Sequence, residues 1–175
     1  METERLIIRP TVWDDLDIFY EWELRPEVTK YFSIKDDQTT EDVVRKYMED
    51  KAAGFEQYTI VLRETGLPIG RIVITDIIEG WKAELWRIYI ADTELRGTGL
   101  GKEAMLAVMD HCFNDLKLER MYLDHYTGNP ASGLYLSLGF KYEGVLRSNC
   151  RKNGILYDVH LMSMLKDEYY GKYGK

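Results

Sequence analysis

The first half of the chain alternates short β-rich runs with segments whose apolar residues recur at helical spacing. Residues 4–10 form a β-rich run that ends at proline, and helical spacing follows over residues 13–24. A second helix, with capping-type residues at its start, is predicted within residues 39–54. Residues 58–63 and 69–78 have the composition of two strands joined by a turn. This half therefore predicts a strand, two helices and a hairpin.

The second half alternates strands and helices more regularly. Residues 85–90 predict a strand, and residues 100–116 predict a helix with one apolar face. A strand over residues 121–126 and a shorter helix over residues 129–138 follow. The last predicted element is a hairpin around residues 152–154, where Asn-Gly provides the turn.

This order of elements predicts an α/β (α+β) fold class. Strands that favour antiparallel pairing come first, and a strand-helix-strand-helix-strand series follows, which indicates one mixed sheet with helices on both faces. The chain has 175 residues, of which 45% are hydrophobic and 30% charged, and these values fit a single domain over residues 1–175. Residues 166–175 are polar and rich in tyrosine, and we expect them to form a peripheral tail.

The charge balance argues against a nucleic-acid partner. Lys and Arg together number 23 against 30 Asp and Glu, which gives a net charge of −7. Binding to a phosphate backbone requires the opposite sign. A cationic small molecule or a peptide amine is compatible with this charge.

Cysteine content and hydropathy indicate a cytoplasmic protein. Cys112 and Cys150 are too few for a disulfide-stapled secreted scaffold, and the first residues do not resemble a signal peptide. No apolar run approaches the roughly 18 residues of a membrane-spanning helix. We therefore expect reduced thiols and no membrane partner.

The most informative segment is a glycine-rich turn between a predicted strand and a predicted helix. Three glycines occur within residues 97–101. Such a turn places backbone N–H groups at the N-terminus of a helix, where the helix dipole also favours anions. The first expectation is a ligand that carries phosphate.

Spacing separates the phosphate-binding patterns. The dinucleotide pattern G-x-G-x-x-G fails from Gly97 because Lys102 occupies its last position, and from Gly99 it ends on Ala104 as a weaker variant. The nucleotide-triphosphate loop fails because Arg96 and Glu103 stand where it needs glycine and Ser or Thr. The pattern R-x-x-G-x-G over residues 96–101 remains.

This pattern resembles the pyrophosphate loop of the GNAT superfamily of N-acetyltransferases, which use acetyl-coenzyme A. Residues 129–140 resemble that family's N-x-x-A-x-x-L-Y-x-x-x-G-F segment, with Tyr135 on its tyrosine, although Asn129 lies one place after its asparagine. The closing hairpin is similar to one branch, which contains the ribosomal-protein N-terminal acetyltransferases and the spermidine/spermine acetyltransferases. The resemblance covers about residues 4–165.

The resemblance implies a fold and an activity. The fold is the GNAT fold, a single mixed, mostly antiparallel sheet of about six to seven strands with helices on both faces. The activity is transfer of the acetyl group of acetyl-CoA to a primary amine of a small molecule or a peptide N-terminus, by direct attack in a ternary complex and without a metal. The alternative is a non-catalytic acyl-CoA-binding or sensor module, against which Tyr135 argues. The sequence leaves open whether the chain forms a homodimer.

The resemblance also implies how acetyl-CoA would be held. The amides of the glycine turn, with the basic side chains beside it, would grip the pyrophosphate, and the backbone of the preceding strand would pair with the pantetheine amides. Asn129 would either bond the coenzyme or cap its helix. The expected coenzyme-binding residues are Ile88, Tyr89, Ile90, Arg96, Gly97, Thr98, Gly99, Gly101, Lys102 and Asn129.

Two catalytic roles are expected. The tyrosine of the family that matches Tyr135 points at the coenzyme sulfur, so Tyr135 is the expected general acid. Glu84 stands close to where several family members carry a glutamate that deprotonates the amine, so it is the expected base. His125 is a second candidate base because imidazole titrates near neutrality, and the alternative is a partly buried histidine.

In the family, the acceptor pocket is built from the segment between the first two helices and from the late hairpin. Tyr31, Phe32 and Asp36 would suit a cationic amine such as a polyamine. Arg147 would instead suit an acceptor that bears a carboxylate. Ser33 follows the aromatic pair where the spermidine/spermine enzymes carry an acid, which weakens the polyamine assignment. The sequence leaves the acceptor open.

Overall fold

The structure is a computed structural model, and it describes residues 1–174. Its strands are β1 (Leu6–Pro10), β2 (Glu56–Leu62), β3 (Pro68–Ile78), β4 (Lys82–Ile90), β5 (Arg120–Tyr126), β6 (Lys141–Lys152) and β7 (Ile155–Leu165). Its helices are α1 (Asp15–Glu23), α2 (Pro26–Thr29), α3 (Thr40–Ala52), α4 (Leu100–Asp110), the π-helical turn η1 (His111–Asp115), α5 (Ala131–Leu138) and α6 (Lys166–Tyr173).

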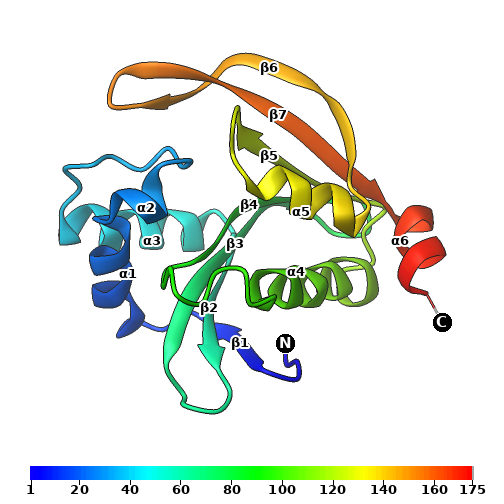
Figure 1. Ribbon diagram of the computed structural model, residues 1–175, viewed down its shortest axis with the longest axis horizontal. Helices are drawn as coiled ribbons and strands as arrows, with labels where there is room; N and C mark the ends of the chain where they lie inside the picture. Colours follow the sequence, from blue (N-terminus) through cyan, green and yellow to red (C-terminus); the bar gives the residue numbers. More distant parts are fainter. Residues whose placement is uncertain (175) are drawn as a thin grey trace.

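The described residues form one seven-stranded sheet in the order β1-β2-β3-β4-β5-β7-β6. β4 and β5 are parallel, and every other adjacent pair is antiparallel. Figure 1 shows α1, α2 and α3 on one side of the molecule, α4 and α5 in front of the strands, and the β6–β7 hairpin along the top. The mixed, mostly antiparallel sheet with helices is therefore confirmed.

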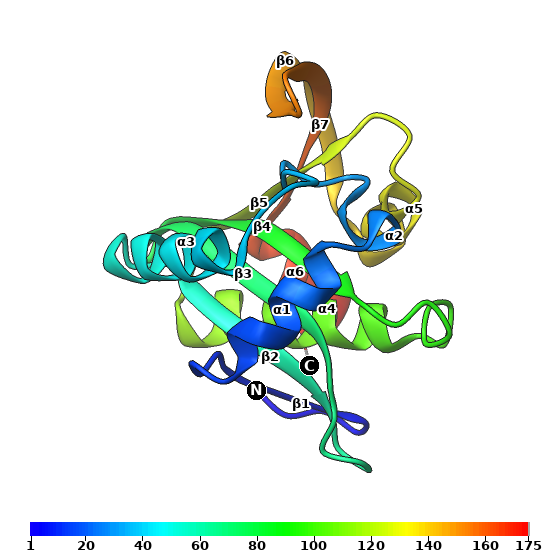
Figure 2. The same cartoon turned by 90° about the vertical axis from the view of Figure 1, so that its left-hand side faces the viewer.

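Two apolar cores pack against the sheet. The larger core joins the sheet to α4, α5 and α6, and includes Met105 and Leu138. The smaller core joins β4 to α1, α2 and α3 around Phe19 and Tyr89. Figure 2 faces the side of α1–α3 and shows the β6–β7 hairpin rising away from them. Because the sheet is covered on both faces, β3 is buried without interruption over Ile69–Thr75, which explains its imperfect alternation.

Local sequence signals set the helix starts. Thr39 and Asp42 form the capping box of α3, in which each side chain accepts a hydrogen bond from the other residue's backbone N–H. α4 begins directly after Gly99 and continues into η1, so the predicted helix over residues 100–116 is found as these two elements. No helix among residues 1–174 combines the length and the apolar character that crossing a membrane needs.

The C-terminal segment corrects the prediction of a peripheral tail. It forms α6, in which Tyr169 is buried and stacks on Phe113 with ring centroids 4.6 Å apart. The hydroxyl of Tyr173 donates to the carbonyl of Leu138 over 3.0 Å. Tyr169 and Tyr173 are four residues apart, so one face of the helix packs on η1 and α5 although the segment is polar on average. Lys175 lies outside the described residues.

One irregularity in β4 positions the functional site. The β3–β4 register skips Trp86, which lies between Leu85 and Arg87 as a β-bulge. A bulge reverses the face to which the following side chains point. Leu85 therefore lies in the larger core, whereas Tyr89, four residues later, lies in the smaller one.

Candidate active site

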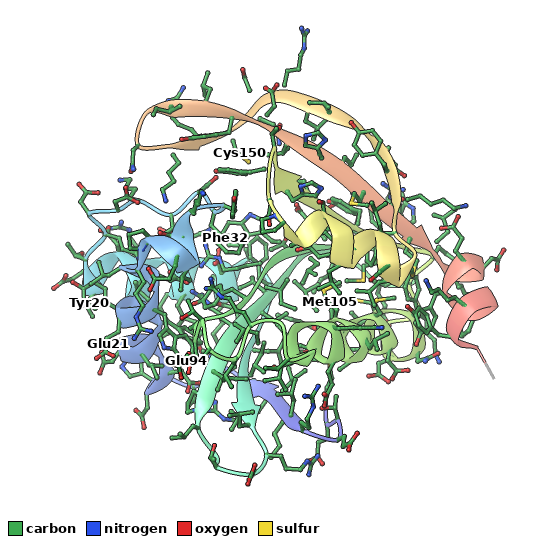
Figure 3. The ribbon with its side chains drawn as sticks, viewed as in Figure 1. Tyr20, Glu21, Phe32, Glu94, Met105 and Cys150 are labelled. Carbon is green, nitrogen blue, oxygen red and sulfur yellow. The ribbon has the colours of Figure 1, made fainter. Side chains whose placement is uncertain are left out.

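A cleft of about 640 Å³ opens where β4 and β5 diverge. These parallel strands pair only over Lys82–Glu84 and Arg120–Tyr122. Beyond that stretch the cleft is lined by the end of β4, the end of β5, the glycine turn, α4, α5, the segment after α2, and β6. Figure 3 labels three lining residues, Phe32, Met105 and Cys150, which come from separate elements and lie around the same central region.

The edge of β4 inside this cleft is an unpaired strand edge. Ile88 and Ile90 pair with β3 on one side, and no strand of the described residues pairs with them on the other. Apart from the carbonyl of Ile90, which accepts a hydrogen bond from Arg96, their backbone groups can therefore bond an extended ligand as an added strand would. The side chain of Tyr89 points away to the smaller core, where its hydroxyl donates to Glu23 Oε1 over 3.0 Å.

The glycine turn joins this edge to the N-terminus of α4. Gly97 and Gly99 have φ of +79° and +91°, a left-handed conformation that residues with a Cβ rarely adopt. Arg96 lines the cleft and donates from Nε to the carbonyl of Ile90 over 3.2 Å. Gly97 and Gly101 also line the cleft. The turn thus places backbone N–H groups and a guanidinium beside the free β4 edge.

Two other expected residues of the turn point elsewhere. Thr98 donates its hydroxyl to the carbonyl of Leu95 over 2.6 Å, so it braces the turn. Lys102 is exposed and does not line the cleft. Sequence reasoning missed Arg5, which donates to the carbonyl of Thr98 over 3.0 Å and pairs with Glu103 over 2.7 Å. Arg5 ties the N-terminal segment to the start of α4.

Tyr135 lies in the wall of the cleft. It is 7% exposed, and its ring centroid is 6.0 Å from that of His125. Burial, with a smaller effect of Asp124, raises the pKa of Tyr135 to about 12. No hydrogen bond from its hydroxyl to another residue is found within residues 1–174. The phenol is therefore protonated at neutral pH and free to donate to a ligand.

Asn129 lines the cleft and starts α5. Its Oδ1 accepts a hydrogen bond from the backbone N–H of Ala131 over 3.0 Å. The side-chain oxygen therefore supports the turn that leads into α5, whose N-cap residue is Pro130.

One acid that lines the cleft is Asp124, on β5, which sequence reasoning missed. Asp124 stands two residues beyond the last β4–β5 pairing, and burial raises its pKa. Glu84 belongs to the paired stretch and does not line the cleft. Its Oε2 accepts from the hydroxyl of Thr75 over 3.1 Å, and its pKa is raised by burial and by Asp124. The two acids are thus neighbours, but Asp124 is the one at the cleft.

His125 is buried, and it also lines the cleft. Its Nδ1 lies 3.1 Å from the carbonyl of Tyr126, and its ring stacks on His160 with centroids 5.2 Å apart. A carbonyl only accepts hydrogen bonds, so Nδ1 carries a proton. These contacts agree with the expectation of a packed histidine on the same strand face as Leu123.

The residues expected to bind the acceptor divide into two groups. Tyr31 and Phe32 line the cleft. Asp36 does not, because its carboxylate pairs with Lys152 over 3.0 Å and joins the segment after α2 to the β6–β7 hairpin. Arg147 is exposed on β6 and also lies outside the cleft.

A buried charge network adjoins the cleft through Arg87, one of the lining residues. Glu23 Oε1 accepts from Nη1 of Arg71 and from Nη1 of Arg87, each over 2.9 Å. All three side chains are at most 7% exposed. One sequence signal could have revealed this network. Glu23 follows Leu16 and Phe19 at the spacing of the apolar stripe of α1. An acid at such a position is buried, and a buried acid needs a partner of opposite charge.

The geometry agrees with the result of comparison with known proteins. A family model described as an acetyltransferase (GNAT) domain matches residues 5–141. The chain belongs to the GNAT acetyltransferase family. This GNAT chain is 32% identical to the uncharacterized N-acetyltransferase p20 of Bacillus licheniformis, with 97% of each chain aligned. It is 29% identical to the uncharacterized N-acetyltransferase YoaA of Bacillus subtilis (strain 168), over 95% of this chain and 96% of YoaA.

Solved structures share the GNAT fold. A spermidine N-acetyltransferase from Vibrio cholerae, in complex with CoA and spermine, has a TM-score of 0.83 at 23% identity, over 95% of this chain and 99% of that one. A GNAT-family acetyltransferase from Bacillus anthracis has a TM-score of 0.79 at 21% identity, over 95% and 98% of the two chains. The chain is therefore an acetyltransferase by its family, and these structures show that it shares their fold.

Proposed function

We propose that this GNAT enzyme transfers the acetyl group of acetyl-CoA to a primary amine of a small molecule or a peptide. The observation that carries the proposal is the free β4 edge, which runs through the cleft between the glycine turn and Tyr135. The pyrophosphate of acetyl-CoA suits the turn, its pantetheine amides suit the unpaired strand edge, and its departing thiolate needs a proton donor.

The residues present fit the coenzyme. The amides of Gly97 and Gly101, with the guanidinium of Arg96, would hold the pyrophosphate at the start of α4. The backbone of Ile88 and Ile90 would bond the pantetheine amides. Lys102 is exposed at the first turn of α4, so it would act only through its charge. Acetyl-CoA supplies the acetyl group as a thioester.

The two groups that move protons are Asp124 and Tyr135. Asp124 accepts the proton that the amine loses as its nitrogen forms the C–N bond with the acetyl carbon. Tyr135, whose raised pKa keeps it protonated until then, donates its proton to the sulfur as the C–S bond breaks. Asp124 is favoured over Glu84 as base because it lines the cleft. The starting state is restored when Asp124 releases its proton to solvent and Tyr135 takes one up, and the products are the amide and the free thiol.

The experiment that tests the proposal separates transfer from binding. Calorimetry with acetyl-CoA measures coenzyme binding, and release of the coenzyme thiol measures transfer to a panel of polyamines, amino acids, aminoglycosides and N-terminal peptides. We expect binding, and thiol release that depends on an amine. Coenzyme binding without transfer to any amine would support the sensor alternative instead.

A further inference from the structure

Arg87 brings a positive charge to the acceptor end of the cleft. It lines the cleft, its side chain is 7% exposed, and its Nη1 donates to Glu23. No other hydrogen bond of this guanidinium is found among residues 1–174. Among residues 1–174, the buried side-chain nitrogen and oxygen atoms that lack a hydrogen-bond partner are Asp50 Oδ2 and Arg71 Nε. Nε and Nη2 of Arg87 are not among these atoms, so they keep some contact with solvent, and Arg87 is a lining residue of the cleft.

The charge of Arg87 is only partly neutralised by the protein. Arg71 and Arg87 share the single carboxylate of Glu23, so this buried group carries an excess positive charge. Asp50 also acts on Arg87, but it pairs with Lys46 over 2.6 Å. An uncompensated buried charge is costly, and a ligand that carries the opposite charge removes this cost.

Two aromatic rings hold the guanidinium in place. The Cζ atom of Arg87 lies 4.7 Å from the ring centroid of Trp86 and 5.9 Å from that of Phe32. Rings that stack on a guanidinium leave its edge free, and this edge presents paired N–H donors that match a carboxylate. The bulge at Trp86 is what brings Arg87 to this position.

An acid stands on the strand that diverges from β4. Asp124 and Arg87 lie just beyond the last paired residues of β5 and β4, and both line the cleft. No ion pair joins these two side chains within residues 1–174, so each remains available to a ligand. The acceptor end of the cleft thus offers one carboxylate and one guanidinium on two neighbouring strands.

We propose that the acceptor of this enzyme is a small amino carboxylate, such as an α-amino acid, whose carboxylate binds Arg87 while its amine faces Asp124. The proposal rests on the proposed acetyltransferase function. A polyamine would instead bring a second positive charge toward Arg87. Glu27, another acid that lines the cleft, is exposed, so solvent and salt screen its charge. Tyr31 and Phe32 supply an apolar wall for the rest of the acceptor.

The test compares each acceptor with its uncharged isostere. Thiol release is measured with leucine, methionine and phenylalanine, with their α-carboxamides, and with spermidine. We expect kcat/KM to be higher for the carboxylate of each pair by about tenfold or more, because the carboxamide leaves Arg87 without its anion. The α-amine of a carboxamide is less basic, and so more often neutral, which means that amine ionisation cannot produce this preference.

Two variants assign the preference to Arg87. In Arg87→Gln the ratio between carboxylate and carboxamide should fall to about one, whereas a merely structural role would lower both rates and leave the ratio unchanged. Arg147→Gln, on the exposed face of β6, is the matched control and should keep the wild-type ratio. If Arg87→Gln does not fold, the ratio of kcat/KM between carboxylate and carboxamide in the wild type still tests the proposal.

The outcomes separate the two proposals. Equal rates for carboxylates and carboxamides, or a preference for spermidine, would overturn the amino carboxylate assignment and leave the acetyltransferase intact. Coenzyme binding without thiol release for any amine would overturn the acetyltransferase function and this assignment with it.

Discussion

Arg87 Nη1 donates a hydrogen bond to Glu23 Oε1 over 2.9 Å, and both side chains are buried. The bond joins the last residue of α1 to the bulged part of β4. It therefore connects α1 to the strand whose unpaired edge lines the cleft. Removal of the Glu23 carboxylate would leave two guanidinium groups without their shared partner, because Arg71 donates to the same oxygen.

Glu23→Gln should lower the free energy of unfolding by about 3 kcal/mol, as expected when one partner of a buried ion pair is removed. Urea denaturation measures this change. Glu27→Gln, an exposed acid on the adjacent α2, is the control and should alter stability by less than about 0.5 kcal/mol. Equal effects of the two variants would mean that Glu23 does not stabilise the fold.

Tyr135→Phe should lower kcat by about a hundredfold, because the variant lacks the proton donor for the departing sulfur. Coenzyme binding, measured by calorimetry, should persist because the ring still fills the wall of the cleft. Tyr142→Phe is a control on the exposed face of β6. An unchanged kcat in Tyr135→Phe would remove this hydroxyl from the mechanism.

The two neighbouring acids should differ in their effect on the pH profile. A general base is active when deprotonated, so kcat/KM of the wild type should fall as pH decreases through the raised pKa of Asp124. Asp124→Asn should lower kcat/KM by about a hundredfold and abolish this acidic limb. Glu84→Gln should retain the limb and most of the activity. The reverse pattern would identify Glu84 as the base.

His111 should make stability depend on pH. Its hydrogen bonds with Glu56 and Asp115, both over 2.8 Å, raise its pKa in the folded state. A raised pKa means that the folded state binds the proton more tightly, so this stabilisation is complete below the unfolded value of about 6.5 and is lost as pH rises through the folded value.

The measurement compares wild type with His111→Gln by urea denaturation at about pH 5.5 and about pH 9. The difference in unfolding free energy between the two proteins should be larger at the lower pH. A difference that is the same at both values would mean that His111 does not bind a proton more tightly in the folded state.

Tyr169→Ala should lower the free energy of unfolding by about 3 kcal/mol, because it removes a buried aromatic ring that stacks on Phe113. Thermal or urea unfolding provides the value. Tyr170→Ala removes a neighbouring ring that is 38% exposed, and its effect should be clearly smaller. Similar effects of the two variants would contradict the packing of α6 through Tyr169.

Local patterns were enough to predict most elements, the glycine turn and the helix that carries Tyr135. The capping box at Thr39, the glycines of the turn and the short helix that carries Tyr135 are signals within a few neighbouring residues. Their order along the chain predicted a mixed sheet, because each helix that follows a strand must cover one of its faces.

The positions of the charged residues in and near the cleft depend on contacts between residues that are far apart in the sequence. Asp124 lines the cleft and Glu84 does not, because β4 and β5 pair only as far as Glu84 and Tyr122. No local sequence pattern shows where two strands stop pairing. Asp36 is held at the β6–β7 hairpin by Lys152, which lies far along the chain. The one-residue register shift at Trp86 determines on which face of the sheet the side chain of Arg87 lies.

The sequence by itself determined the kinds of element, the glycine turn and the short helix that carries Tyr135, because these depend on backbone conformation and spacing within single segments. Only the tertiary structure decided which charges meet. Glu23, Arg71 and Arg87 lie on three separate elements, and their pairing exists only once the helices close over the sheet and water is excluded from all three. Burial and proximity, which set the chemistry of charged groups, are properties of the packed chain.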